Sequence, residues 1–249
     1  MATEKTELEW PYSPYDFFEV PYRRQTDDYV LIADGGMLRI TLRTACDPID
    51  ADLQNRITKE VEDLFLVRQL LVHRIFELES MRVYQHHPDG KKSISVSVGG
   101  VLALGQVGQV DIVLCDASGA VVQDTKSERI TEHTKFIDSV VSKIASSETL
   151  NALLESYKAA VADPTSELVR LYEIRDALAK HYGGDAEARR KLRITERDWK
   201  QLGTLANNAP LKEGRHRGRH SKLRHATRAE LDEARRIARC LIEAFANEL

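Results

Sequence analysis

Residues 121–144 read VVQDTKSERITEHTKFIDSVVSKI, and within them the spacing of the apolar residues changes from that of a strand to that of a helix. The run that begins with Val121 and Val122 is β-branched, which is typical of a strand. From about residue 133 the apolar residues recur at the period of one helix face: Phe136, Ile137, Val140, Val141 and Ile144. We therefore expect one architecture before residue 130 and a different one after it.

The sequence before residue 130 predicts several strands and one long helix. Ala-Asp-Gly-Gly between two apolar runs predicts a β-hairpin over residues 29–42. Asp50 is a candidate N-cap for a helix from residue 51 to about Met81, and residues 1–28 are expected to form an ordered extended arm. Further strands are expected at residues 93–98, 101–104, 110–115 and 120–125. The fold class is therefore α+β, with an N-terminal domain of mixed sheet and one long helix over residues 1–130.

After residue 130 helical periods continue to the end of the chain, which predicts an all-helical bundle over residues 131–249. Asp163-Pro164 is a helix-start signal. A short helix is expected at residues 186–192, and Thr195 is a candidate cap for the next helix. Thr227-x-x-Glu230 is a capping box that opens the last helix.

Composition excludes several classes of protein. Hydrophobic residues make up 42% and charged residues 30% of the 249 residues, as in a folded protein. No apolar run is long enough for a transmembrane helix, and MATEKTELEW has no apolar core of a secretory signal. Three widely spaced cysteines argue against a disulfide scaffold. We therefore expect a cytoplasmic protein that does not contact a membrane.

Charge is distributed unevenly along the chain. Residues 166–249 contain 19 Lys and Arg against 13 Asp and Glu, whereas residues 1–165 contain 17 against 26. Opposite net charges in the two parts suggest two domains, and a polyanion is expected to meet the C-terminal one.

The segment that carries chemistry is the polar connection LKEGRHRGRHSKLRHA before the last helix. Residues 212–228 contain seven cations and one acid, Glu213, together with three histidines. A helix N-terminus already favours an anion, arginine binds phosphate oxygens through a planar fork, and histidine transfers protons near neutral pH. These groups supply what metal-free RNA cleavage needs: a base, an acid and positive charge at the phosphate.

Arg215-His216-Arg217-Gly218-Arg219-His220 resembles the Arg-x(4–6)-His signature of the HEPN domain family. The resemblance covers about residues 133–249 and implies an all-helical domain that acts as a homodimer with a composite site. Many members of that family are metal-independent endoribonucleases of toxin–antitoxin, CRISPR or anti-phage systems, so an antitoxin or defence partner is also implied, and no cofactor. The family roles give Arg215 phosphate positioning, His220 proton transfer and His216 a supporting polar role. A second register fits equally, with Arg219 and His225 as the pair and His220 in the polar position.

The remaining cations of the loop are expected to bind RNA phosphates, and they also support a non-catalytic alternative. In that alternative the loop is a module that binds nucleic acid or a protein. The cations concerned are Arg217, Arg219, Lys222, Arg224 and Arg228. A zinc site at the three histidines is disfavoured because seven cations surround them.

A second alternative lies in the N-terminal part. Asp111, Asp124 and Lys126 follow the spacing of a PD-(D/E)xK nuclease hairpin, in which two carboxylates bind Mg²⁺ and the lysine stabilises the phosphate. Asp111 follows Val rather than Pro, which departs from that pattern. Outside these sites, His73 is expected to be a partly exposed residue within the long helix.

Overall fold

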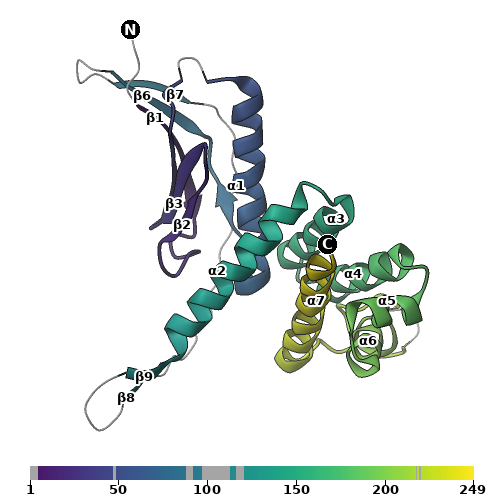
Figure 1. Cartoon of the computed structure of the whole chain (residues 1–249). Helices are drawn as coiled ribbons and strands as arrows, with labels where there is room; N and C mark the ends of the chain where they lie inside the picture. The colour runs from purple at the N-terminus through teal and green to yellow at the C-terminus, as the bar shows by residue number, and fades with distance from the viewer. Residues whose placement is uncertain are drawn as a thin grey trace. The chain divides into compact units, whose positions relative to one another are not determined.

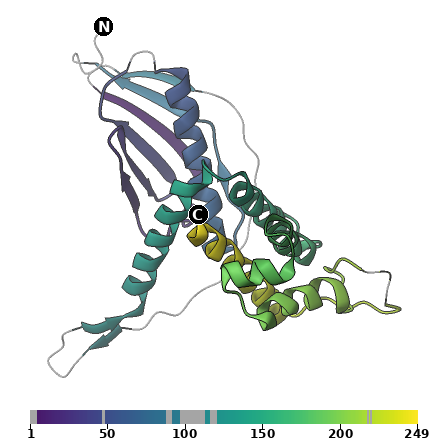
Figure 2. The same cartoon turned by 45° about the vertical axis from the view of Figure 1, so that its right-hand side comes forward.

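The computed structural model describes residues 5–46, 49–87, 92–96, 113–115, 121–216, 218 and 220–249. The chain divides into two compact units (Figures 1 and 2). The first unit is Met1–Arg68 with Arg74–Ile130, and the second is Gln69–His73 with Thr131–Leu249. The first contains an antiparallel sheet with one long helix and the second is helical, so the α+β fold class is confirmed.

An antiparallel sheet forms the first unit. Its strands run in the order β2 (Tyr22–Gln25), β3 (Tyr29–Asp34), β4 (Met37–Leu42), β1 (Lys5–Ser13), β6 (Arg82–His86) and β7 (Lys92–Val96). The predicted hairpin is confirmed by β3 and β4, whose turn places Gly35 at φ 53° and Gly36 at φ 86°. Positive φ at both central residues matches the twist of a two-residue hairpin, and glycine adopts it without a steric penalty.

The expected N-terminal arm is extended, but it is an interior strand rather than an arm. β1 pairs with β4 on one side and with β6 on the other. Its side chains alternate, so Leu8, Trp10 and Tyr12 are buried. Pro11 lacks an N–H and lies where pairing with β6 has ended, at Glu9, and pairing with β5 (Glu77–Leu78) has not begun.

Helix α1 (Ala51–Val72) runs along one face of this sheet (Figures 1 and 2). Its start is as predicted, because a carboxylate oxygen of Asp50 accepts the backbone N–H of Leu53 at 3.1 Å. Phe65 is fully buried and stacks on Phe17 with the ring centres 5.4 Å apart. The prediction that the helix continues to Met81 is wrong, because His73 adopts φ 46° and the chain then enters β5.

A second two-stranded sheet pairs β8 (Val113–Cys115) with β9 (Val121–Asp124). The strand predicted at residues 101–104, and residues 110–112 of the next one, lie outside the described residues. Helix α2 (Thr125–Ile144) follows β9 directly, so the helix starts earlier than the apolar period at residue 133 suggests. Residues 125–132 are polar except for Ile130, and a single apolar residue carries no period.

The second unit contains α3 (Glu148–Ala162), α4 (Glu167–His181), α5 (Asp185–Leu192), α6 (Glu196–Gly203), a π-helical turn η1 (Thr204–Asn208) and α7 (Arg228–Glu248). Helix α7 packs against α3, α4, α5 and α6, and it buries Ala234, Ile237, Ala238, Leu241, Ile242, Phe245 and Ala246. Among the described residues, no helix is both long enough and apolar enough to cross a membrane.

The predicted helix signals of this unit have mixed outcomes. The caps at Thr195 and Thr227 are confirmed, the latter as a complete capping box with Glu230. The start at Asp163-Pro164 is wrong, because Asp163 ends α3 and Ser166 precedes α4. The carboxylate of Asp163 accepts hydrogen bonds from Thr165, so it shapes the turn between the two helices.

Candidate functional site

The polar connection before α7, here called the basic loop (residues 211–226), has its two ends joined by backbone hydrogen bonds. Leu211 is 1% exposed and forms a parallel bridge with Arg224. The N–H of Lys212 donates to the carbonyl oxygen of Arg224 at 2.9 Å. The N–H of Arg224 donates to the carbonyl oxygen of Pro210 at 3.0 Å. Residues 213–223 therefore form a closed loop whose base is fixed by backbone hydrogen bonds.

Arg215, the first residue of the predicted signature, is held against α4. Its backbone N–H donates to the carbonyl oxygen of Ala206 in η1 at 2.6 Å. Its guanidinium lies 3.0 Å from a carboxylate oxygen of Asp176 and 5.5 Å from the ring centre of Tyr172. Both partners belong to α4, so the charge of Arg215 is matched by an acid and its planar face rests on an aromatic ring.

The two histidines assigned to this register lie elsewhere in the loop. His216 is exposed, whereas His220 is partly buried, and its Nε2 is inaccessible to solvent and has no hydrogen-bond partner among the described residues. Within the described residues Arg215 has no hydrogen bond or ion pair with either histidine. The structure therefore does not bring Arg215 and His220 together within one chain.

His225, from the second register, has a polar partner at each of its two ring nitrogens. Its Nδ1 lies 2.8 Å from Oε1 of Glu213, and its Nε2 lies 3.2 Å from Nζ of Lys212. A carboxylate only accepts hydrogen bonds and an ammonium only donates them. This arrangement therefore fits a neutral imidazole with its proton on Nδ1 and its lone pair on Nε2.

Glu213 is the buried member of this group. It is 8% exposed, and its second oxygen accepts the backbone N–H of Ala226 at 2.9 Å. Burial raises the pKa of Glu213, but the hydrogen bonds from Ala226 and His225 lower it by a larger amount. The pKa of Glu213 is therefore below its ordinary value. The carboxylate therefore stays ionised and keeps the orientation of the His225 ring fixed.

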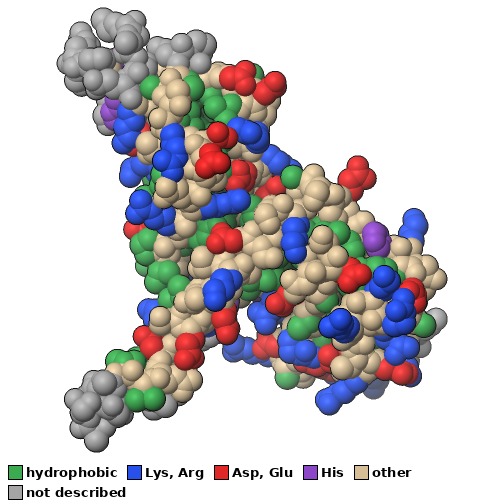
Figure 3. Space-filling model, in the orientation of Figure 1, with side chains coloured by type: hydrophobic (Ala, Val, Ile, Leu, Met, Phe, Trp, Pro, Cys, Tyr) green, Lys and Arg blue, Asp and Glu red, His purple; other side chains and the backbone are tan. Residues whose placement is uncertain are grey.

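Other cations of the loop are matched by acids. Arg224 binds Glu230 through two hydrogen bonds of 2.7 and 2.6 Å, and Arg228 lies 3.6 Å from Asp232. Lys222 is exposed, and Arg217 and Arg219 lie outside the described residues. On the face drawn in Figure 3, Lys and Arg side chains alternate with Asp and Glu over the helical unit. This face is therefore mixed in charge rather than uniformly basic.

The alternative metal site is only partly within the described residues. Asp111 lies outside them. Asp124 ends β9, and one carboxylate oxygen accepts the N–H groups of Lys126 and Ser127 at 3.1 and 3.0 Å. Asp124 thus caps α2, and Nζ of Lys126 lies 3.7 Å from Glu19. In the described part of the chain, no group of three or more His, Cys, Asp or Glu residues could hold a metal ion.

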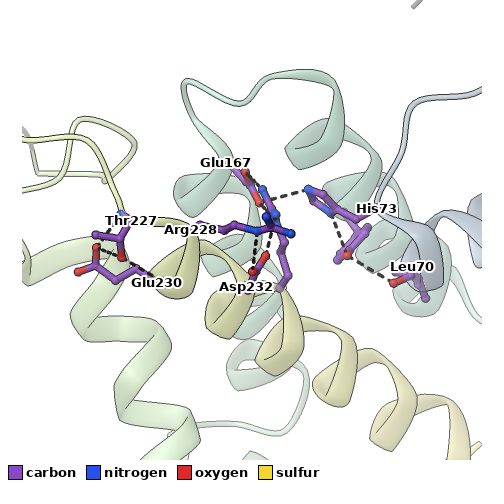
Figure 4. Close-up of polar contacts among 9 residues, drawn as sticks. Leu70, His73, Glu167, Thr227, Arg228, Glu230 and Asp232 are labelled. Carbon is purple, nitrogen blue, oxygen red and sulfur yellow. Dashed lines mark hydrogen bonds and ion pairs between the residues drawn. The ribbon is translucent and has the colours of Figure 1, made fainter. Parts of the chain in front are cut away.

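Sequence reasoning missed a buried ion pair in the helical unit. Arg235 of α7 binds Glu167 of α4 through hydrogen bonds of 2.6 and 2.8 Å, and Glu167 is 1% exposed. His73 is not in a helix, and its Nε2 lies 3.3 Å from Glu167 while its Nδ1 lies 3.0 Å from the Tyr157 hydroxyl (Figure 4). Burial raises the pKa of Glu167, but Arg235 and His73 bring it below its ordinary value.

The sequence separations explain why this group was missed. Glu167 and Arg235 are 68 residues apart, and His73 and Tyr157 are 84 apart, so no local spacing links them. The available signal was weak: an acid at the start of one helix and a cation on the apolar side of another.

In comparisons with known proteins, no family model, no curated protein and no solved structure matches the chain.

Proposed function

We propose that this protein is a metal-independent endoribonuclease of the HEPN type, in which His225 rather than His220 takes the proton of the attacking hydroxyl. The observation that supports this most is the contact of the exposed imidazole of His225 with the buried carboxylate of Glu213. An ionised carboxylate that fixes the tautomer and orientation of a histidine is the arrangement that general bases need.

In the proposed reaction the 2′-hydroxyl oxygen of RNA forms a bond to the adjacent phosphorus, and the bond from phosphorus to O5′ breaks. Nε2 of His225 accepts the 2′-hydroxyl proton while Nδ1–H stays bonded to Glu213. Lys212, 3.2 Å from Nε2, supplies positive charge where the phosphorane develops. The products are a 2′,3′-cyclic phosphate and a 5′-hydroxyl.

A second histidine must protonate the leaving O5′, and a homodimer through the helical unit supplies it in this proposal. His220 is the candidate for this second histidine, because its Nε2 has no hydrogen-bond partner among the described residues. The resemblance to HEPN proteins, which build one site from two motifs, supports this arrangement. By the same resemblance we propose RNA as the substrate, Arg217, Arg219 and Lys222 as its phosphate contacts, and defence or a toxin module with an antitoxin as the setting.

The test is RNA cleavage by the purified full chain in EDTA, with end-group analysis of the products. His225→Gln should lower cleavage by about 10²- to 10⁴-fold, the range for loss of a general acid or base. Glu213→Gln should lower it less, because it removes the orienting carboxylate and not the proton carrier. His216→Gln is the matched control, since it changes an exposed histidine of the same loop. RNA binding, measured in parallel, should change little in all three variants.

Three results would contradict the proposal. Cleavage that survives His225→Gln but is lost in His220→Gln would assign the chemistry to the Arg215 register. Cleavage that requires Mg²⁺ and is lost in Asp124→Asn would favour the metal-nuclease alternative. RNA binding without cleavage under any condition would identify a non-catalytic binding module.

A further inference from the structure

A pocket of about 180 Å³ opens in the helical unit beside α7. Three arginines of α7 line it, Arg235, Arg236 and Arg239, together with Asp232, His73 and Tyr157. None of these residues belongs to the basic loop that precedes α7. Arg235 and Arg239 are four residues apart and therefore project from the same side of the helix.

One of the three arginines that line this pocket differs from the other two in having no acidic partner among the described residues. Arg235 is matched by Glu167 at 2.6 Å and by Asp232 at 3.0 Å. Arg236 is matched by Glu233 at 2.8 Å and by Asp198 at 2.9 Å. Arg239, by contrast, has no hydrogen bond or ion pair in the part of the chain that the structure describes. The charge of Asp232, the one acid of the lining, is shared with Arg235 and with Arg228 at 3.6 Å.

Two further hydrogen-bonding groups, a hydroxyl and an imidazole, lie next to these cations. The Tyr157 hydroxyl and Nδ1 of His73 are 3.0 Å apart. Burial raises the pKa of Tyr157 even though Arg239 and Arg235 act to lower it, so the hydroxyl keeps its proton. The pocket thus presents one unmatched guanidinium beside a neutral hydroxyl and an imidazole.

We propose that this pocket binds a small oxyanion of the phosphate class, with Arg239 as the principal ligand. An arginine fork matches two oxygens of a phosphate, and Arg239 has no other partner in the described part of the chain to compete for it. The volume is below the roughly 300–1,000 Å³ of pockets for drug-sized ligands, so the occupant is a phosphate ion or the phosphate of a small monoester. The site is distinct from the proposed ribonuclease loop, and neither requires the other.

Titration calorimetry of the full chain tests the proposal, with inorganic phosphate in one arm and glycerol 3-phosphate in the other. Saturable binding is expected in at least one arm, and the tighter arm identifies the source of the phosphate. Arg239→Gln should weaken that binding by about tenfold or more, as expected for loss of a charge-assisted contact. Because Arg239 has no acidic partner, its replacement leaves no buried acid unpaired. Arg239→Lys, which keeps the charge but loses the fork, should have an intermediate effect.

Two control variants distinguish phosphate binding at this pocket from binding elsewhere in the helical unit. Arg193→Gln removes an exposed arginine of the same unit and should leave the affinity unchanged. His225→Gln, which tests the ribonuclease proposal, should also leave phosphate binding unchanged. Absence of saturable binding up to about 10 mM in both arms would overturn the proposal. Equal binding by the unmodified protein and Arg239→Gln would overturn it as well.

Discussion

Replacing Arg235 with Met should destabilise the helical unit strongly, because it leaves the Glu167 carboxylate buried with little compensation. Glu167 is 1% exposed, and of its ion-pair partners among the described residues it would keep only His73, at 3.3 Å. Breaking a buried pair by removing one partner costs about 3–5 kcal/mol. The Arg235 side chain is 26% exposed, so water can reach part of the vacated space. We therefore expect the lower end, about 3 kcal/mol, a large part of a typical 5–15 kcal/mol of total stability.

The same substitution should make stability depend on pH with a defined sign. In the unmodified protein the folded pKa of Glu167 lies below its ordinary value of 4.5. The pair therefore stabilises the fold above that value, and this contribution is lost as pH falls through the folded pKa. In Arg235→Met burial persists without the guanidinium, so the folded pKa should rise above 4.5. The variant is then penalised mainly at neutral pH, and the difference between the two proteins should shrink toward pH 4.

Urea unfolding at about pH 7 and about pH 4 measures this difference. Trp199 is 2% exposed and reports on the helical unit, and a Trp10→Phe background removes the other tryptophan. Arg228→Met is the matched control on the same helix, since its pair with Asp232 is exposed and should be worth under about 1 kcal/mol. A loss from Arg235→Met that equals the control, or that is the same at both pH values, would refute the reasoning.

Three further substitutions test the local structure. Thr227→Ala should cost about 1 kcal/mol in urea unfolding, because it removes the oxygen that caps α7. Gly214→Ala should speed amide hydrogen exchange at the base of the loop, because an added Cβ would lie 3.0 Å from a carbonyl oxygen, whereas Gly218→Ala meets nothing within 4 Å. Phe65→Ala should cost about 3–5 kcal/mol by removing the centre of the aromatic core, and Tyr15→Ala, at a residue 74% exposed, should cost much less in the same assay.

The fold was predictable where one physical signal acted alone. Two adjacent glycines between apolar runs predicted the hairpin of β3 and β4, because positive φ at both positions strongly favours that turn. The capping box at Thr227 was equally local and was confirmed. Both signals depend on hydrogen bonds or dihedral angles within a few residues, so the rest of the chain has little influence on them.

Predictions failed where a tertiary contact outweighed a local pattern. Ile75 and Leu78 continue the helical period of α1, yet Leu78 pairs with Tyr12 of β1 instead. Two further apolar residues are too short a run to distinguish a helix from a strand by periodicity, so the pairing with β1 decides the structure here. Asp163-Pro164 failed for a related reason: a short polar residue before proline also suits the turn that ends a helix.

At the candidate site, the number of cations in the sequence did not predict which of them are paired with acids. Seven cations in residues 212–228 suggested a surface for phosphates, but Arg215 is matched by an acid 39 residues away in α4 and Arg224 by one 6 residues away in α7. Such pairing depends on which helices meet, and no spacing within the loop encodes it. The more informative residue was the single acid among the cations. Glu213 is buried where its carboxylate meets Nδ1 of His225 and accepts the N–H of Ala226, so the ring of His225 takes its orientation from that carboxylate. The exception to the charge pattern therefore identifies the histidine with a defined tautomer, which the abundance of cations could not.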